Sequence, residues 1–385
     1  MSCSAWTALL FLATLAADAA PTPLRVVSTQ PATEWNALFE TRSGWIGGDG
    51  VFSVPLRNDR VLWLFGDTLY GRVDGRRRVD AVMVNNSLAI TGRTPTDPVE
   101  FPTFRTDKQA IRSALVPPTG PGWYWPISAT LVERRLVVFV VRIEKSEDPG
   151  VFGFRMIGQS VALVENPEAA PSDWKIDWLD LPNALMTARR QRSWGLAVIR
   201  SGDWLYLYGV DELIPADPAK GEFDRKQLVL ARVHPASLTR FESWQYLGET
   251  GWSGDPAAVQ PLLRGLANEY SVTLLPDDSA FLLVHTDCGL SPRILARIAA
   301  SPEGPWSEPT VLFTKPEVVA DKGLFGYNGK AHPWACRATG PNRGTLLINY
   351  SVNSWEFGRL FQDETVYRPR FVTVEYERPV EDAPR

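Results

Sequence analysis

Short apolar runs bounded by Gly, Pro, Asn and Asp recur along this chain of 385 residues, and almost no segment shows sustained helical periodicity. This distribution is typical of an all-β protein. A more specific pattern occurs five times, as a short strand, a polar turn and a second, strongly apolar strand with a polar end. The predicted strand pairs are Gly50–Pro55 with Val61–Asp67, Trp125–Leu131 with Leu136–Ile143, Trp194–Ile199 with Trp204–Gly209, Tyr270–Leu275 with Ala280–His285, and Lys330–Ala335 with Thr345–Tyr350.

Five repeated units, each unable to bury both faces alone, predict a five-bladed β-propeller over residues 21–379. We expect the strands Leu24–Ser28 and Arg370–Glu377 to close the ring of blades, with 380–385 as a polar tail. An ordinary β-sandwich is the alternative architecture.

The first 20 residues predict a signal peptide. An apolar run, Ala8–Ala16, is followed by the small-residue pattern Ala17-Asp18-Ala19, although the first six residues contain no Lys or Arg. No later stretch approaches the roughly 18 apolar residues of a membrane helix. We therefore expect a secreted or periplasmic protein, monomeric and without a membrane partner.

Charge and the absence of several motifs argue against a number of functions. The 40 Lys and Arg and 44 Asp and Glu are interspersed, and the formal net charge is −4, which argues against nucleic acid as a partner. The chain has no zinc-like Cys/His spacing, no phosphate-binding glycine loop and no nucleophile elbow. We expect no cofactor, although a structural or axial cation such as Ca²⁺ is compatible with the carboxylates.

The first strand pair carries an aspartate at the far end of each strand. If Arg57-Asn58-Asp59 is a three-residue turn, Leu56 faces Arg60, and the same register carried back along the hairpin places Asp49 opposite Asp67. Directly opposed residues point to one face of a sheet, with Cβ atoms about 4.5–5.5 Å apart. A two- or four-residue turn would place the carboxylates on opposite faces, so the pairing depends on turn length.

Two carboxylates held together away from water cannot easily both ionise, so one can serve as an acid and the other as a base or nucleophile. Cleavage of a glycosidic bond needs this division of roles. The alternative is that Asp49 and Asp67 are turn and strand-end residues whose side chains accept backbone hydrogen bonds.

Corresponding positions in the other strand pairs predict the rest of the pocket, because these strand ends converge on the axis of a propeller. Aromatic, amide and charged side chains suit sugars, whose C–H faces stack on rings and whose hydroxyls need hydrogen-bond partners. The predicted substrate-binding residues are Trp125, Arg142, Trp194, Tyr270, Asn328, Lys330, His332 and Asn353.

Some of these residues have structural alternatives. Aromatic rings also pack between blades, and we favour that role for Trp63, Trp204 and Trp334 but not for Trp125 or Trp194. His332 is either an acid–base or ion-binding group or a hydrogen-bonded core histidine.

Several short motifs follow one another along the chain: Gly48-Asp49-Gly50, Phe65-Gly66-Asp67-Thr68, Asn86-Ser87, Leu230–Val233 with Trp244, Tyr327-Asn328, Ala331-His332-Pro333 and Asn349–Asn353. In this order they resemble the five-bladed propellers catalogued as domain of unknown function 4185, which are similar to glycoside hydrolase family 183. A more distant resemblance, to families 43 and 32, includes Ser301–Trp306.

The first resemblance implies an endo-acting hydrolase of D-arabinofuranose polymers with Asp49 and Asp67 as its catalytic pair. The more distant one implies a glutamate of the third blade as general acid, for which Glu212 is the candidate. The leading hypothesis is an exported glycoside hydrolase that cleaves furanoside linkages in a cell-wall or environmental polysaccharide. The alternative is a non-catalytic carbohydrate-binding propeller that uses the aspartates for hydroxyls or a cation.

Overall fold

The computed structural model describes residues 19–147, 151–215 and 225–379. The predicted leader, apart from its last two residues, and the predicted C-terminal tail lie outside the described residues.

Each of the five predicted strand pairs corresponds to a sheet of its own. The inner strand of the fifth pair, predicted at Lys330–Ala335, instead lies at Leu324–Ala331, and Pro333–Ala335 forms a 3₁₀ helix. The first sheet contains β3 (Phe52–Pro55), β4 (Val61–Phe65) and β7 (Ser87–Thr91). The second contains β10 (Trp123–Val132), β11 (Arg135–Lys145), β12 (Phe154–Val164) and β13 (Ile176–Asp180). The third contains β14 (Leu185–Met186), β15 (Arg190–Ser201), β16 (Trp204–Leu213), β17 (Lys226–Val233), β18 (Gln245–Gly248), β19 (Gly251–Ser253) and β20 (Leu263–Arg264).

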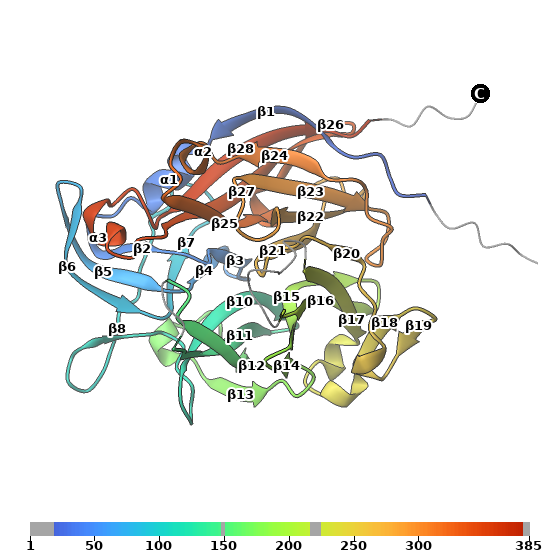
Figure 1. The fold of residues 1–385 in the computed structure, drawn as a ribbon, viewed down its shortest axis with the longest axis horizontal. Helices are drawn as coiled ribbons and strands as arrows, with labels where there is room; N and C mark the ends of the chain where they lie inside the picture. Colours follow the sequence, from blue (N-terminus) through green and yellow to red (C-terminus); the bar gives the residue numbers. More distant parts are fainter. Residues whose placement is uncertain (1–18, 148–150, 216–224, 380–385) are drawn as a thin grey trace, which may run out of the picture.

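The fourth sheet contains β21 (Tyr270–Leu274), β22 (Phe281–Thr286), β23 (Arg293–Ala299) and β24 (Thr310–Thr314). The fifth contains β25 (Leu324–Ala331), β26 (Arg337–Gly340), β27 (Arg343–Ser354), β28 (Pro369–Glu377) and β1 (Arg25–Pro31). The two predicted terminal strands thus pair with each other, as β1 and β28 (Figure 1). Short helices, α1 (Thr33–Leu38), α2 (Pro316–Ala320) and α3 (Arg359–Gln362), lie in the connections.

The innermost strands form a ring. Strand β10 packs against β3 on one side and β15 on the other, β15 packs against β21, and β21 packs against β25. Figure 1 shows the five sheets arranged around this centre. The fold is therefore an all-β propeller, and the sandwich alternative is excluded.

Apolar side chains fill the spaces between neighbouring sheets. Leu64 and Val138 belong to one buried cluster between the first and second sheets, and Leu207 and Leu283 belong to another between the third and fourth. Because both faces of a sheet are covered, all five residues of β4 are buried. This explains why the second strand of each predicted pair is apolar throughout.

Side-chain hydrogen bonds join the fifth sheet to the first and complete the ring. The hydroxyl of Ser53 in β3 lies 2.6 Å from His332 Nδ1 and accepts a hydrogen bond of 2.8 Å from Trp334 Nε1. His332 Nε2 lies 3.0 Å from Asn349 Oδ1. Beside them, Lys330 Nζ donates to the carbonyl oxygen of Gly50.

A sheet that the sequence analysis did not predict extends the first hairpin outward. It contains β2 (Ser43–Gly48), β5 (Thr68–Asp74) and β6 (Arg77–Val84), and a ribbon of β8 (Phe104–Arg105) and β9 (Ile111–Arg112) follows β7. The chain therefore passes from β2 into β3 and returns from β4 into β5. Asp49 and Asp67 lie where the hairpin changes from one sheet to the other.

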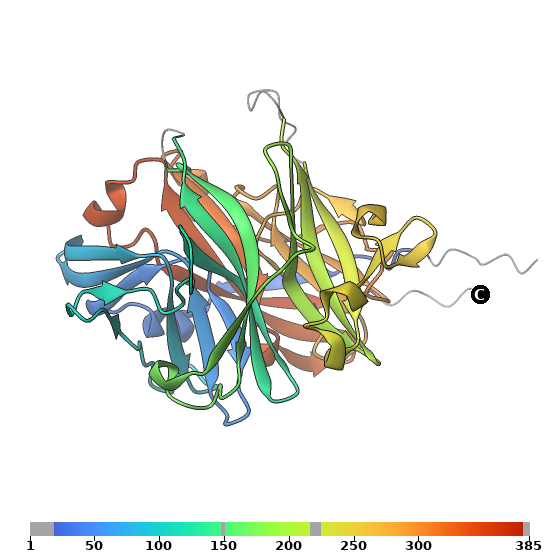
Figure 2. The same ribbon diagram turned by 90° about the horizontal axis from the view of Figure 1, so that it is seen from below.

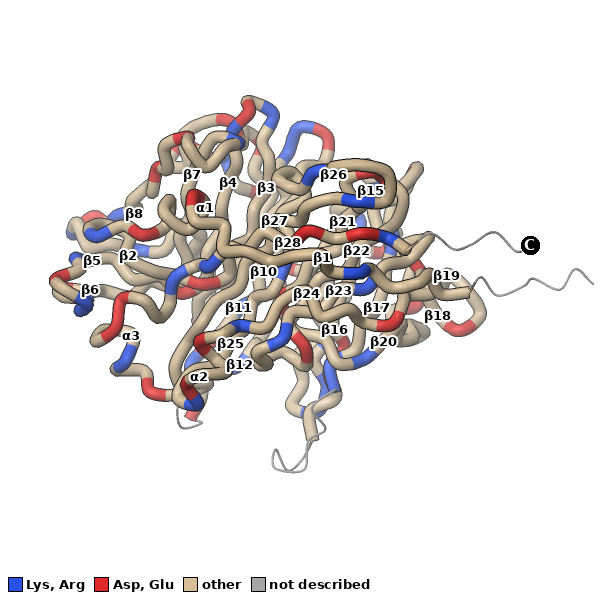
Figure 3. Tube along the Cα trace, turned by 90° about the horizontal axis from the view of Figure 1, so that it is seen from above, with Lys and Arg blue, Asp and Glu red and all other residues tan. Residues whose placement is uncertain are grey.

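Basic and acidic residues are interspersed over strands and connections, and neither sign gathers in one part of the tube (Figure 3). Within residues 19–147, 151–215 and 225–379, no helix has the length and apolar character needed to cross a membrane.

The ring closure predicts a large effect for one small side chain. Ser53→Ala would remove the partner of both His332 and Trp334 and should lower the free energy of unfolding by about 1–3 kcal/mol. The matched control is Ser28→Ala, because Ser28 lies in exposed β1 and donates to Glu375; it should change stability by less than about 0.5 kcal/mol. Chemical denaturation measures both. Equal effects would show that Ser53 does not join the sheets.

Candidate active site

The register of the first hairpin agrees with the predicted one. Pro55 pairs with Val61 and Phe52 with Leu64, and the Leu56 N–H donates to the Arg60 carbonyl oxygen across a three-residue turn. Farther along, the Asp49 N–H donates to the Asp67 carbonyl oxygen at 3.4 Å. The backbones of the two aspartates therefore meet at the position that the turn length predicts, although Gly50 and Val51, with φ +83° and +58°, interrupt the regular pairing between Asp49 and β3.

Two glycines make this arrangement sterically possible. A Cβ atom at Gly66 would lie 2.5 Å from Asp49 Oδ1, so a side chain there would displace the carboxylate. Gly50 has φ +83°, and a Cβ atom there would lie 2.8 Å from the nitrogen of Gly66. The Gly-Asp-Gly and Phe-Gly-Asp sequences are therefore requirements of close packing at this bend.

The Asp49 carboxylate is held by two tyrosines of the fifth sheet and its preceding loop. Tyr327 in β25 donates to Oδ2 at 2.6 Å, and Tyr367, just before β28, donates to the same oxygen at 3.2 Å. Burial, followed by the charge of Asp67, raises the pKa of Asp49 to about 7, while the hydroxyl donors Tyr327 and Tyr367 oppose the shift. Sequence analysis did not assign these tyrosines, although Tyr327 lies within a quoted motif.

The Asp67 carboxylate has different partners. Its Oδ1 accepts hydrogen bonds from Trp125 Nε1 at 2.8 Å and from Asn85 Nδ2 at 3.3 Å. Burial raises the pKa of Asp67 to about 6, while these two donors oppose the shift. Trp125 is partly exposed and borders the site, in agreement with its predicted place.

A third carboxylate and a lysine lie close enough to affect Asp49. Glu269, between β20 and β21, raises the pKa of Asp49 through its charge, and burial raises the pKa of Glu269 itself. Burial lowers the pKa of Lys330 to about 7, against the opposing charges of Glu269 and Asp49. Lys330 was predicted to bind substrate, but its amine is buried and donates to the carbonyl oxygens of Gly50 and Asn328. Glu269 was not predicted, and its only signal in the sequence is its position before the first residue of an innermost strand.

Trp194 and Tyr270 were predicted on the pocket wall, and this prediction was wrong. Trp194 has 0% exposure, packs against Tyr246 and donates from Nε1 to the Asn183 carbonyl oxygen. Tyr270 has 1% exposure, and its hydroxyl donates to the Gly209 carbonyl oxygen. Both rings belong to the core between sheets.

A backbone irregularity accompanies the inward position of Trp194. The pairing of β15 with β16 shifts between Trp194 and Ala197, and Gly195 has φ +73°. A Cβ atom at Gly195 would lie 2.4 Å from the ring of Phe139, so β15 approaches the second sheet closely here. Trp194 accordingly fills the space between sheets.

His332 is a core histidine rather than an acid–base group. Both ring nitrogens have neutral partners, and burial lowers the pKa of His332 to about 3. Asn328 is also buried, with φ +60°, and its Nδ2 donates to Ser351 at 3.3 Å. The predicted role of these two residues as direct sugar ligands is therefore replaced by support of β25.

The three remaining predicted residues have other partners than the aspartates. Asn353 Nδ2 donates to the Tyr327 hydroxyl at 3.4 Å and so is one contact removed from Asp49. Arg142 donates to the carbonyl oxygens of Thr119 and Pro121 and holds that loop. Glu212 in β16 is ion-paired with Arg225 and, at 3.9 Å, with Lys226.

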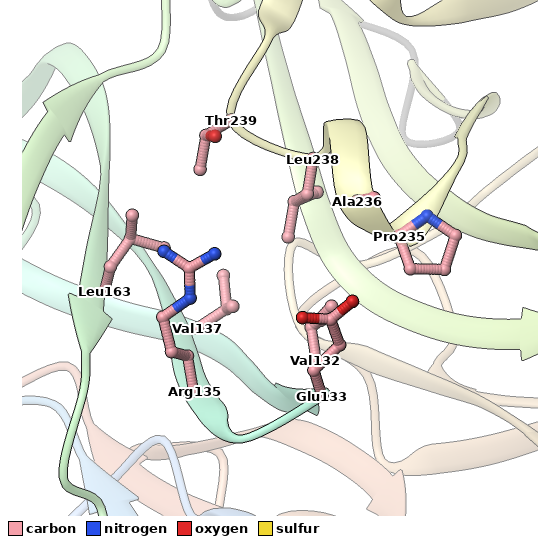
Figure 4. A pocket seen from close by; sticks show the side chains of 9 residues that line it. All are labelled: Val132, Glu133, Arg135, Val137, Leu163, Pro235, Ala236, Leu238 and Thr239. Carbon is pink, nitrogen blue, oxygen red and sulfur yellow. The ribbon is translucent and has the colours of Figure 1, made fainter.

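Two cavities of the structure are lined by residues other than the carboxylate pair; Figure 4 shows the first of them. The first, between the β10–β11 turn and residues 235–239, has a volume of about 20 Å³, which suits roughly one water molecule. The second, of about 260 Å³, is lined by residues that include Pro21, Ser279 and Arg378. Within the part of the chain that the structure describes, no group of three His, Cys, Asp or Glu residues is arranged to hold a metal ion.

Fold and site together define an all-β propeller with two opposed, partly buried carboxylates. The chain belongs to the family described as Domain of unknown function (DUF5005), which matches residues 32–376. The more specific resemblance to domain of unknown function 4185 and glycoside hydrolase family 183 stays a prediction.

Two curated relatives match part of the chain. Notoamide biosynthesis cluster protein J' of Aspergillus versicolor is 32% identical over 161 residues, which is 40% of this chain and 38% of that protein. Notoamide biosynthesis cluster protein J of Aspergillus sp. (strain MF297-2) is 31% identical over 141 residues, or 35% and 34%. The chain thus spans little more than a third of either relative.

Solved structures match nearly the whole chain. A provisionally assigned hydrolase of Bacteroides ovatus ATCC 8483 has a TM-score of 0.70 at 19% identity, and the match covers 90% of each chain. It supports the fold. A GH43_1 enzyme of Xanthomonas citri, solved with xylotriose, has a TM-score of 0.43 at 15% identity, with 89% of this chain and 92% of that chain covered.

Because Asp49 and Asp67 have different hydrogen-bond donors, removal of one donor should change the pKa of one aspartate and leave that of the other nearly unchanged. Tyr327→Phe removes a donor that stabilises ionised Asp49 and should raise the pKa of Asp49, whereas Trp125→Phe should raise that of Asp67, each by about one pH unit. Carboxyl ¹³C chemical shifts followed against pH measure both. Tyr350→Phe is the control, because its hydroxyl donates to Glu317 and should leave both aspartates unchanged. Unchanged titrations in the first two variants would contradict the assigned hydrogen bonds.

Proposed function

We propose that this protein is a glycoside hydrolase that cleaves furanoside linkages, with Asp49 and Asp67 as its catalytic pair. The observation that carries the proposal is that one hairpin holds these two carboxylates directly opposite each other, partly buried, and gives each a different set of hydrogen-bond donors. Two carboxyl groups in unlike environments are what acid and base or nucleophile roles at a glycosidic bond require.

The surroundings of each carboxylate suggest its role. Asp49 has the higher pKa, about 7, and the charges of Asp67 and Glu269 favour its protonated form, so it is the proposed general acid. Asp67 has the lower pKa, about 6, so it is the proposed base or nucleophile. Each carboxylate accepts two hydrogen bonds, so the neighbouring charges at Asp49 are what separate the two roles. The same differences separate an acid from its partner in other paired-carboxylate sites.

Glu212 is the competing acid. Its carboxylate contacts Arg225 and Lys226, and an acid at this position would have to leave these ion pairs before it could reach a leaving group. The hydrogen-bond partners of Asp49 are the neutral hydroxyls of Tyr327 and Tyr367 instead of cations, which favours the two-aspartate scheme.

The proposed substrate is a D-arabinofuranosyl linkage in a cell-wall or environmental polysaccharide. Its support is the resemblance of the Gly48-Asp49-Gly50 and Phe65–Thr68 motifs to the propellers described above. The leader-like residues 1–20 support action outside the cytoplasm.

A non-catalytic carbohydrate-binding propeller is the second candidate. One observation favours it: both carboxylates already accept two hydrogen bonds from the protein, as purely structural acceptors would. Binding of a polysaccharide without release of products after long incubation would support this candidate.

Substitution of either aspartate should abolish turnover. Asp49→Asn and Asp67→Asn keep the size of the side chain but remove its acid or base, and each should lower kcat by about 10²–10⁴-fold. Glu212→Gln is the matched control and should retain most activity. Release of oligosaccharides from arabinan measures all three variants. Near-normal activity in both aspartate variants would exclude the proposed pair, and loss in Glu212→Gln alone would favour the third-sheet acid.

The pH dependence of kcat/KM should be bell-shaped, with its maximum between about pH 6 and 7. Activity falls below this range because Asp67 becomes protonated, and it falls above it because Asp49 loses its proton. Tyr327→Phe should move only the alkaline limb, to higher pH, because it raises the pKa of Asp49. A profile that is flat from pH 4 to 9 would contradict these roles.

A further inference from the structure

We propose that Phe152, Phe325 and Trp355 form an outer aromatic surface that binds sugar residues of the substrate chain away from the cleaved bond. This inference rests on the proposed function, because it describes how the same site would hold a longer carbohydrate. The three rings come from the β11–β12 connection, from β25 and from the residue that follows β27.

One line of ring contacts leads from Asp49 to this surface. Tyr327, whose hydroxyl donates to Asp49, lies 5.6 Å from Phe325 between ring centroids. Phe325 in turn lies 4.5 Å from Trp355, with the two rings inclined at 43°. The exposed indole is therefore two ring contacts away from the hydroxyl that holds the carboxylate.

A second line leads from Asp67 and ends at the same place. Trp125, which donates to Asp67, lies 4.6 Å from Phe154, and Phe154 lies 6.2 Å from Phe152. The two lines meet because Phe152 lies 5.9 Å from Phe325 and 6.0 Å from Trp355. Residues from the second and fifth sheets, on either side of the first sheet, thus form one continuous wall. In Figure 2 the green β11–β12 hairpin overlaps the orange and red strands of the fifth sheet, and the contacts of Phe152 with Phe325 and Trp355 join the two.

The far end of this wall is open to solvent. Phe152 is 42% exposed and Trp355 is 48% exposed, whereas Phe325 beneath them is 4% exposed. Large aromatic side chains gathered on a surface, instead of scattered singly, mark a binding site more often than a purely structural feature.

The exposure and position of the rings favour an extended carbohydrate as the occupant. Half-exposed rings can cover the apolar C–H face of a sugar while its hydroxyls remain hydrated, so no polar group is buried without a partner. The surface lies beyond Tyr327 and Trp125, so a ligand that reaches it from the aspartates must extend past the residue at the cleaved bond. We therefore infer an oligo- or polysaccharide chain rather than a simple glycoside.

The test compares substrates of different length. A p-nitrophenyl arabinofuranoside probes the carboxylate pair alone, and arabino-oligosaccharides from the disaccharide to the hexasaccharide probe the surface as well. Phe152→Ala and Trp355→Ala should each lower kcat/KM for the hexasaccharide by roughly three- to tenfold and leave that for the aryl glycoside within about twofold. Trp355→Phe should recover much of the loss, because it restores an aromatic face.

Phe357→Ala is the matched control. Phe357 is 51% exposed, but its ring packs against Phe361. This variant should behave as the parent protein on every substrate. Thermal melting of all variants checks that the fold is intact, and gel filtration checks whether the exposed rings instead join two copies of the chain.

The outcomes separate this inference from the proposed function. Equal losses on short and long substrates, or a dimer that dissociates in Trp355→Ala, would overturn the inference while hydrolysis at the aspartates stands. If no substrate is cleaved, polysaccharide binding by gel-retardation electrophoresis replaces the kinetic measurement. Weaker retardation of Trp355→Ala than of Phe357→Ala would then support the surface, and equal retardation would overturn it.

Discussion

The opposition of two carboxylates at the bend of the first hairpin is the constraint on which the rest of the site depends. Two like charges in a partly buried place destabilise each other, and burial adds to the cost of ionising either. Hydrogen-bond donors from three parts of the fold stabilise the two carboxylates. Tyrosines of the fifth-sheet region donate to Asp49, whereas an indole of the second sheet and Asn85, after β6, donate to Asp67. The hairpin supplies the charges, and its neighbours determine their acidity.

Ring closure and site chemistry share the same strand. Strand β25 carries both Tyr327 and Lys330. Tyr327 donates to the Asp49 carboxylate, and Lys330 donates to the carbonyl oxygen of Gly50, the residue after Asp49. Directly after it, His332 joins Ser53 and Asn349. A change that loosens the contact between the fifth and first sheets would therefore also move the donors of Asp49. This coupling explains why so many buried polar groups gather at one junction of an otherwise apolar core.

Sequence reasoning succeeded where local geometry decides the outcome. The pairing of Asp49 with Asp67 follows from the length of one turn, and the observed register of β3 and β4 agrees with it. The propeller follows from five repeated strand pairs. Trp194 and Tyr270 were misplaced because position along a strand predicts nearness to the axis but not which face a ring takes, and the irregular pairing near Gly195 cannot be read from the sequence.

Residues that act on the aspartates from a distance were the hardest to predict. Tyr367 is more than 300 positions from Asp49, and its hydroxyl reaches the carboxylate only because the last sheet returns to the first. Glu269 affects Asp49 through its charge, which no local pattern indicates. Burial raises the pKa of Asp49 and lowers the pKa of Lys330, so that both lie at about 7. Both shifts depend on the closed ring, because it buries the two side chains together. The acidity of the site is thus a property of the closed ring, whereas its carboxylates are a property of one hairpin.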